Sequence, residues 1–169
     1  LGTPSGRIEI YSSTIAGFNY PEDPGHSVWR PPVEWLGSDH AGQFPLHLVS
    51  PQPGDKLHSQ LECAIADRPG ERPAPLSINP VDAACRRITT GALVRVFNNR
   101  GACLARAVLT ESVREGVVVL PTGAWFSPGS DAIDSQGNPN VLTRDRGTSR
   151  IGQGSSAHST LVEVIPFPK

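Results

Sequence analysis

LVRVFNNRGACLARAVL, residues 93–109, is the stretch that decides the fold of this 169-residue chain. Residues 93–98 alternate apolar and polar side chains, as a half-buried β-strand does, and a second apolar run follows at 102–109. Between the two runs lie Asn99, Arg100 and Gly101, and asparagine and glycine tolerate the positive φ of tight turns. The stretch therefore predicts a β-hairpin.

Further short runs on both sides indicate more strands and one helix. The strand candidates are residues 7–12 (RIEIYS), 46–49, 76–78, 117–120 and 161–165. NPVDAACRR at 79–87 predicts a short helix, because Asn79 can cap it and Pro80 suits its first position. Many short strands with few helices predict a mainly β fold, either a barrel or a sandwich.

The length predicts one compact domain preceded by an irregular segment. Residues 16–45 contain prolines at 21, 24, 31, 32 and 45 and almost no periodic apolar pattern. We expect residues 1–43 to form an extended N-terminal connector with one strand, lying across a neighbouring domain, and 44–169 to form the β domain. Disorder of the connector in isolation is the alternative.

Charge and hydropathy exclude some partners. The formal net charge is −1 and the sequence pI is about 6.6, so we expect no nucleic-acid partner. The longest apolar runs fall well short of the ~18 residues of a membrane span, so we expect no membrane insertion.

The reactive side chains show no catalytic or metal-binding spacing. Cys63, Cys85 and Cys103 are far apart and odd in number, which favours reduced cysteines packed among other residues. The five histidines lack ligand spacing, so we expect no metal site built from protein side chains alone. His58 and Ser59 adjoin each other, but no nucleophile elbow accompanies them, and no Rossmann or P-loop glycine pattern is present. We expect no catalytic residue.

Two loops are instead dense in amide, hydroxyl and glycine residues. The first loop is SPQPGDKLHSQ at 50–60, and the second loop is GNPNVLTRDRGTSRIGQG at 137–154. Amide side chains present both donors and acceptors and can match the rim of a purine or pterin ring, while the basic residues suit phosphate. Ordinary solvated turns have a similar composition and are the alternative.

Several segments in order resemble the C-terminal domain of the molybdopterin oxidoreductases. They are TPSGRIEIYS (3–12), FPLHLVSPQPGDKLHSQL (44–61), INPVDAACRRITTGALVRVFNNRGACLARAVLT (78–110), VREGVVVLPTGAWFSP (113–128) and the second loop. Within this dimethyl sulfoxide reductase family, the chain is most similar to the biotin sulfoxide and trimethylamine N-oxide reductases. The resemblance covers nearly the whole chain and implies a six-stranded double-psi β-barrel, the fold of aspartate decarboxylase.

The resemblance also implies a role. Such a domain caps bis(molybdopterin guanine dinucleotide) with molybdenum in a bacterial enzyme that reduces an S-oxide or N-oxide. The remaining domains of the same enzyme supply the metal ligand, so the isolated domain is expected to be inactive. The implied cofactor-binding residues are Ser50, Gln52, Pro53, Lys56, His58, Ser59, Gln60, Gly137, Asn138, Gln153 and Gly154. Lys56 departs from the family, which usually has arginine at this position. The planar guanidinium group of arginine can donate two hydrogen bonds to one phosphate or ring, whereas lysine offers a point charge.

Other interpretations stay open at this point. Trp125 and Phe126 match an aromatic pair of the family, for which we expect a core or domain-interface role. The chain could instead be a non-catalytic interaction module on the same barrel, or belong to the formate dehydrogenase or nitrate reductase branch. A self-contained decarboxylase-like enzyme would need an internal cleavage site. The resemblance fits both cytoplasm and periplasm.

Overall fold

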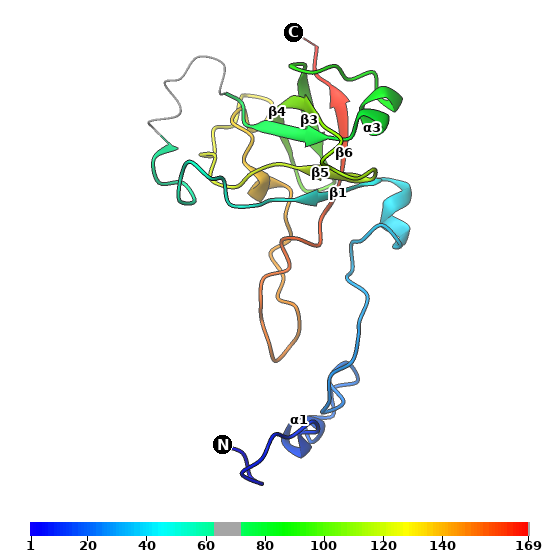
Figure 1. Cartoon of the computed structure of the whole chain (residues 1–169), viewed down its shortest axis with the longest axis vertical. Helices are drawn as coiled ribbons and strands as arrows, with labels where there is room; N and C mark the ends of the chain where they lie inside the picture. The colour runs from blue at the N-terminus through cyan, green and yellow to red at the C-terminus, as the bar shows by residue number, and fades with distance from the viewer. Residues whose placement is uncertain (63–71, 169) are drawn as a thin grey trace.

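The computed structural model describes residues 1–62 and 72–168, and six strands in it close into a barrel (Figure 1). The strands are β1 (Leu46–Val49), β2 (Pro75–Ile78), β3 (Leu93–Phe97), β4 (Ala102–Leu109), β5 (Val117–Val119) and β6 (Leu161–Pro166). Their order around the barrel is β1-β5-β2-β4-β3-β6. The pairs β1–β5 and β2–β4 are parallel, and the other pairs are antiparallel. The mainly β, six-stranded barrel expected from the sequence is confirmed, with the two parallel pairs of a double-psi arrangement.

The hairpin predicted at residues 93–109 forms as β3 and β4. Phe97 lies opposite Ala102, and the Asn98 N–H donates to the Gly101 carbonyl at 3.1 Å. Gly101 is needed because a Cβ there would lie 2.7 Å from the carbonyl oxygen of Val141, in the 3-10 helix η2 (Pro139–Val141). The turn thus packs directly against the start of the second loop.

The barrel interior is filled by alternate residues of all six strands. On β4 the inward positions include Ala105 and Ala107, both fully buried, and these small side chains leave room for the larger ones facing them. The larger strand residues of this core are Leu46, Leu48, Leu76, Ile78, Val94, Val96, Val118, Val162 and Val164.

The helix α3 (Pro80–Cys85) confirms the capping pattern in the sequence. The Asn79 side-chain oxygen accepts from the Val81 N–H at 2.9 Å, and its Nδ2 donates to the Val113 carbonyl at 2.7 Å.

Cys85 is exposed, so the expectation of a packed thiol is wrong there, because it lies on the outer side of this surface helix. Cys103 is buried as expected, and burial, with Asp134 nearby, raises its thiol pKa. Cys63 lies outside the described residues.

The connector contains two short helices, α1 (Ser13–Ala16) and η1 (Asp39–Gly42), and no strand. The strand predicted at 7–12 is therefore wrong for this structure. The side chains of Ile8 and Ile10 are 84% and 88% exposed, because no segment among the described residues pairs with them. The connector descends from the barrel on the same side as the second loop (Figure 1).

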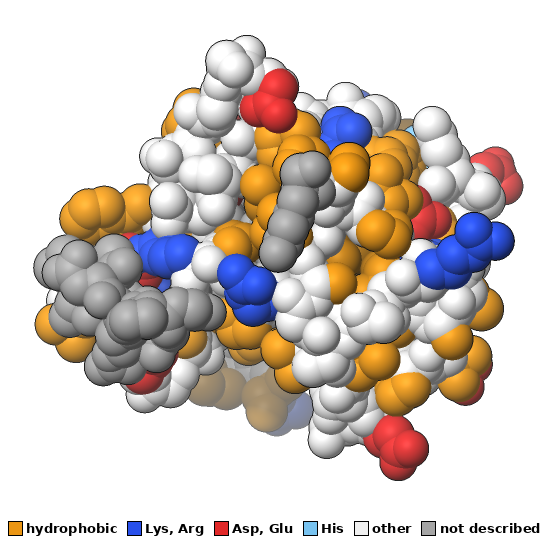
Figure 2. All heavy atoms as spheres, turned by 90° about the horizontal axis from the view of Figure 1, so that it is seen from above, with side chains coloured by type: hydrophobic (Ala, Val, Ile, Leu, Met, Phe, Trp, Pro, Cys, Tyr) orange, Lys and Arg blue, Asp and Glu red, His pale blue; other side chains and the backbone are white. Residues whose placement is uncertain are grey.

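The opposite end of the barrel is largely apolar. Seen from above, hydrophobic side chains gather across the middle of this face, and charged side chains are scattered singly around them (Figure 2). Among the exposed apolar residues are Val81 of α3 and Ile165 of β6.

The Gly101 contact yields a test of the hairpin packing. Gly101→Ala should lower the free energy of unfolding by about 1–3 kcal/mol, because the new methyl group forces the η2 backbone away from the turn. Gly42→Ala is the control, since a Cβ there meets nothing within 4 Å, and we expect a change within about 0.5 kcal/mol. Urea unfolding measures both. Equal stability of the two variants would contradict the packing described here.

Candidate cofactor-binding surfaces

The first loop leaves the barrel beside the residues that follow β5. Parallel strands end at the same edge of a sheet, so β1 and the adjacent β5 deliver their following loops to one place. The Pro51 carbonyl accepts from the Thr122 N–H at 3.0 Å, and the Ser59 carbonyl accepts from the indole N–H of Trp125 at 3.3 Å. The loop is thereby held against residues 121–125.

Most predicted residues of the first loop face solvent. Gln52, His58, Ser59 and Gln60 are exposed, while Ser50, Pro53 and Lys56 are half-buried. Trp125 and Phe126 beside the loop are 54% and 60% exposed. A core role for this pair is wrong within this chain, because the pair lies on the outside of the barrel, and a domain-interface role stays a prediction.

Lys56 is engaged in an internal ion pair. Its ammonium group contacts Glu62, which is 1% exposed, and the same carboxylate contacts Arg72. A cleft of about 330 Å³ opens beside this cluster, lined also by Pro53 and Arg106. The Nε donors of Arg72 and Arg106 are buried without a partner among the described residues. Arg72 and Arg106 thus bring guanidinium groups to a lining that also contains Asp55 and several apolar side chains.

The base of the second loop is organised by Asp134. This carboxylate is fully buried and accepts from the N–H groups of Gly137 at 2.8 Å, Asn138 at 2.7 Å and Ser127 at 2.8 Å. The Asn138 side chain in turn caps η2 by accepting from the Asn140 N–H at 2.9 Å. Gly137 and Asn138 therefore shape the loop. Sequence reasoning missed Asp134, although an aspartate followed three and four residues later by Gly-Asn is a recognisable turn signal.

The tip of the second loop is a compact turn. The Thr148 N–H donates to the Gly154 carbonyl at 2.9 Å, and the Ser149 hydroxyl accepts from the N–H groups of Ile151 and Gly152 at 3.2 and 2.7 Å. The Gln153 amide donates to the Ser149 carbonyl, which leaves the amide oxygen as an acceptor. Gln153 and Gly154 are both exposed.

A second cleft, of about 690 Å³, lies between the second loop and the connector. Its basic and polar lining residues are Arg30, Arg144, Arg146, Arg150, Thr148, Ser149, Gln153, Ser156 and Ser159. Only Glu22 and Glu34 oppose this charge among the lining residues. An excess of guanidinium groups with hydroxyl and amide groups fits a ligand that carries phosphates and a polar ring.

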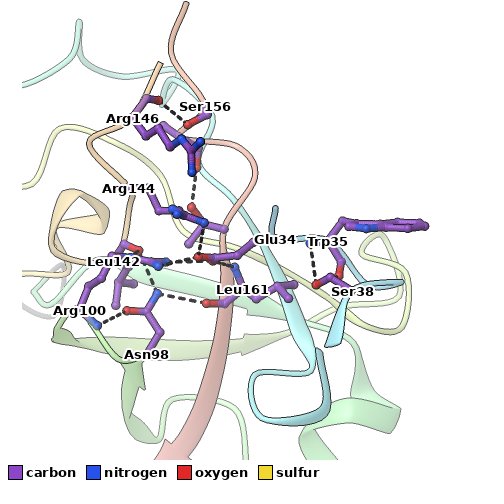
Figure 3. A network of polar contacts seen from close by, with 12 residues as sticks. Glu34, Trp35, Ser38, Asn98, Arg100, Leu142, Arg144, Arg146, Ser156 and Leu161 are labelled. Atoms are coloured by element: carbon purple, nitrogen blue, oxygen red, sulfur yellow. Dashed lines mark hydrogen bonds and ion pairs between the residues drawn. The ribbon is translucent and has the colours of Figure 1, made fainter. Parts of the chain in front are cut away.

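Glu34 joins the connector, the hairpin turn and the second loop (Figure 3). Its carboxylate accepts from Arg100 Nη1 at 2.6 Å, from Arg100 Nη2 at 3.0 Å and from the Leu161 N–H at 3.0 Å, and Arg144 lies 3.6 Å away. Arg100 Nε also donates to the Leu142 carbonyl at 2.8 Å. The buried side chain of Asn98 donates to both the Leu142 and the Leu161 carbonyls. One carboxylate thus ties the connector to the hairpin turn, to Arg144 of the second loop and to the start of β6.

The charge state of Glu34 follows from these contacts. Burial raises the pKa of Glu34, but the hydrogen bonds from Arg100 and the Leu161 N–H, with the charges of Arg100 and Arg144, outweigh it. The pKa of Glu34 is therefore held below its ordinary value. The carboxylate stays ionised at neutral pH, and the network that it centres stays intact.

The predicted binding residues do not meet in one place. Pro53 and Lys56 line the first cleft and Gln153 lines the second, while Gly137 and Asn138 lie at the buried base of the second loop. The two loops leave different parts of the barrel (Figure 1). The arrangement is a small barrel with two separate clefts, the first lined by apolar and by both acidic and basic side chains, and the second richer in guanidinium groups. Arg144, Arg146 and Arg150, which belong to the basic residues of the second loop suited to phosphate, all line the second cleft.

Comparison with known proteins identifies the family. Residues 46–161 match the model of the molydopterin dinucleotide binding domain, and the chain belongs to this family. It is 48% identical over 167 residues to biotin sulfoxide reductase of Cereibacter sphaeroides, covering 97% of this chain and 22% of that protein. It is 46% identical over 180 residues to trimethylamine-N-oxide reductase 1 of Escherichia coli (strain K12), covering 99% of this chain and 21% of that protein. The chain thus spans about a fifth of the length of these relatives.

A solved structure supports the fold. Acetylene hydratase from Pelobacter acetylenicus superposes with a TM-score of 0.75 at 21% identity, covering 98% of this chain and 24% of that one.

In the part of the chain that the structure describes, no helix has both the length and the apolar character to cross a membrane. The same residues contain no cluster of three or more histidine, cysteine or acidic side chains that could hold a metal ion.

Glu34 provides a pH-dependent test of the network. Its folded pKa lies below the ordinary glutamate value of about 4.3, so its stabilisation is present above that pH and is lost as the pH falls through the folded pKa. Glu34→Gln should lower the free energy of unfolding by about 1–3 kcal/mol at pH 7, with the difference from wild type shrinking below about pH 4.

Glu22→Gln is the matched control for this test. Its partner Arg150 is 64% exposed, and exposed ion pairs contribute little, so we expect a change within about 0.5 kcal/mol. Urea unfolding followed by tryptophan fluorescence suits the measurement, because Trp35 adjoins Glu34. A loss for Glu34→Gln that is equally large at pH 3 and pH 7 would refute the role assigned to the carboxylate.

Proposed function

We propose that this chain is the C-terminal cofactor-binding domain of a molybdenum-dependent reductase acting on an S-oxide or N-oxide. The observation that carries the proposal is the similarity of 46–48% over nearly all of this chain to a biotin sulfoxide reductase and a trimethylamine-N-oxide reductase. Relatives of this kind favour the S- and N-oxide branch over the formate dehydrogenase or nitrate reductase branch. They also favour an enzyme domain over a stand-alone interaction module.

In this proposal the chain binds and orients a bis(molybdopterin guanine dinucleotide) cofactor. The cofactor supplies the redox chemistry when it is bound, and the metal ligand comes from other parts of the parent protein. The chain's own contribution is hydrogen bonding and electrostatics. Each neutral hydrogen bond contributes roughly 1 kcal/mol and charged ones more, so binding depends on several contacts together.

In this proposal each cleft binds a different part of the cofactor. Around the second cleft, Arg146 is placed to neutralise phosphate oxygens, and Arg150 adds a charge that it shares with Glu22. The Gln153 amide oxygen is free to accept from a guanine or pterin N–H. At the first cleft, the guanidinium groups of Arg72 and Arg106 would donate to acceptors on a second pterin guanine dinucleotide. Two separate clefts suit a cofactor with two dinucleotide arms.

The exposed residues of the first loop complete the proposed site. Gln52, His58, Ser59 and Gln60 present side chains to solvent and are available to a ligand, with Ser50 and Pro53 at the loop's entrance. Lys56 supplies a point charge already shared with Glu62, so we expect its own contribution to be smaller than that of a free lysine. Gly137, Asn138 and Gly154 act through the shape of the second loop.

Partners follow from the same proposal. The remaining domains of the parent enzyme would cover the other side of the cofactor, and the small oxidised substrate would reach the metal there. The chain carries no catalytic residue in this account, so we expect the isolated domain to be inactive. Removing the cofactor's binding contacts should therefore lower cofactor content and activity together.

Gln153→Ala in the full-length protein tests the proposal. Loss of an amide that contacts the cofactor should reduce the molybdenum and guanine dinucleotide content several-fold, with activity per molybdenum much less affected. Gln43→Ala is the control, because Gln43 is also an exposed glutamine but lies outside both clefts. Asn138→Ala is less informative, since Asn138 caps η2 and its loss also disturbs the barrel. Unchanged metal and pterin content in Gln153→Ala would count against the site.

A further inference from the structure

The segment at residues 7–11 has the properties of a β-strand without a partner. Its side chains alternate, and those of Ile8 and Ile10 are among the most exposed large apolar side chains described. No hydrogen bond among the described residues involves the backbone N–H or carbonyl groups of residues 8–11. A row of free backbone groups beside alternating apolar side chains is what strand pairing uses.

The turn before this segment is already formed. The Gly6 N–H donates to the Thr3 carbonyl at 2.9 Å, and Gly6 has a φ of +66°. The Thr3 hydroxyl donates to the Arg7 carbonyl at 2.6 Å, and Glu9 accepts from the Ser5 N–H at 3.0 Å. The end of the segment is fixed as well, because the Ser12 N–H donates to the Gly25 carbonyl at 2.7 Å. Both ends are therefore set while the middle stays unpaired.

The length of the relatives indicates where a partner would be. Nearly all of this chain aligns to only about a fifth of each relative, so a parent of similar length has about four fifths of its residues elsewhere. A strand of five residues has too few contacts to hold a separate molecule tightly. Within one polypeptide the same pairing is intramolecular and benefits from a high effective concentration.

We propose that residues 7–11 add as an edge strand to a β-sheet in another part of the parent polypeptide, with Ile8 and Ile10 buried on an apolar face there. The proposal rests on the proposed function only in placing the chain within a longer protein. The strand pattern in the sequence would then form after all, because its partner belongs to another domain. The connector would serve as a second attachment between the barrel and that domain, beside the Glu34 network.

Hydrogen exchange on the full-length protein tests this pairing. In an edge strand, alternate amides among residues 7–11 should exchange at least about 100-fold more slowly than in a random coil. Ile8→Lys with Ile10→Lys should abolish that protection. Arg7→Gln with Glu9→Gln is the control pair on the opposite face and should retain it.

Two results would overturn the proposal. One is exchange of all these amides at the random-coil rate in the full-length protein. The other is protection that disappears on dilution, which would assign the pairing to a second copy of the protein. Pterin content measured on the same sample separates this proposal from the proposed function: a loaded protein with an unprotected segment refutes the strand alone, and a protected segment without pterin refutes the cofactor role alone.

Discussion

The ion pair between Glu34 and Arg100 is the interaction on which the arrangement of this molecule depends. The barrel closes through its own strand pairing, and this pair with its neighbours ties both the connector and the second loop to it. A buried carboxylate is costly unless it is well paired, and here two guanidinium donors and a backbone N–H pair it. Because Arg100 belongs to the hairpin turn, the stretch that decides the fold also fixes the position of the second cleft.

Much of the fold could be predicted from local patterns. The hairpin at 93–109, the capped helix at α3 and the other barrel strands lie where alternation and turn chemistry place them. The prediction of a strand at 7–12 is wrong for a physical reason. Alternating side chains indicate that a segment can pair as a strand, but pairing also needs a partner strand, which the described residues do not contain. The same limit applies to Trp125 and Phe126, whose exposure depends on what else covers them.

The candidate site was only partly accessible from the sequence. Loop composition predicts polar ligand binding, and Gln52, Gln60 and Gln153 are exposed in the structure, so ligand binding by these amides stays a prediction. Composition could not distinguish residues that face a ligand from residues that build the loop, and Asn138 proves to be a helix cap. Nor could it show that Lys56 is paired with a buried Glu62 or that the two loops border separate clefts, because these facts depend on contacts between distant segments.

If the two clefts of this barrel hold the two arms of one large cofactor, an experimental structure of the full-length protein purified with its cofactor will show both arms in place. Density for one guanine dinucleotide should then lie within hydrogen-bonding distance of Gln153 and the arginines of the second loop, and density for the other should lie beside the first loop. Cofactor density that contacts neither loop would contradict this placement.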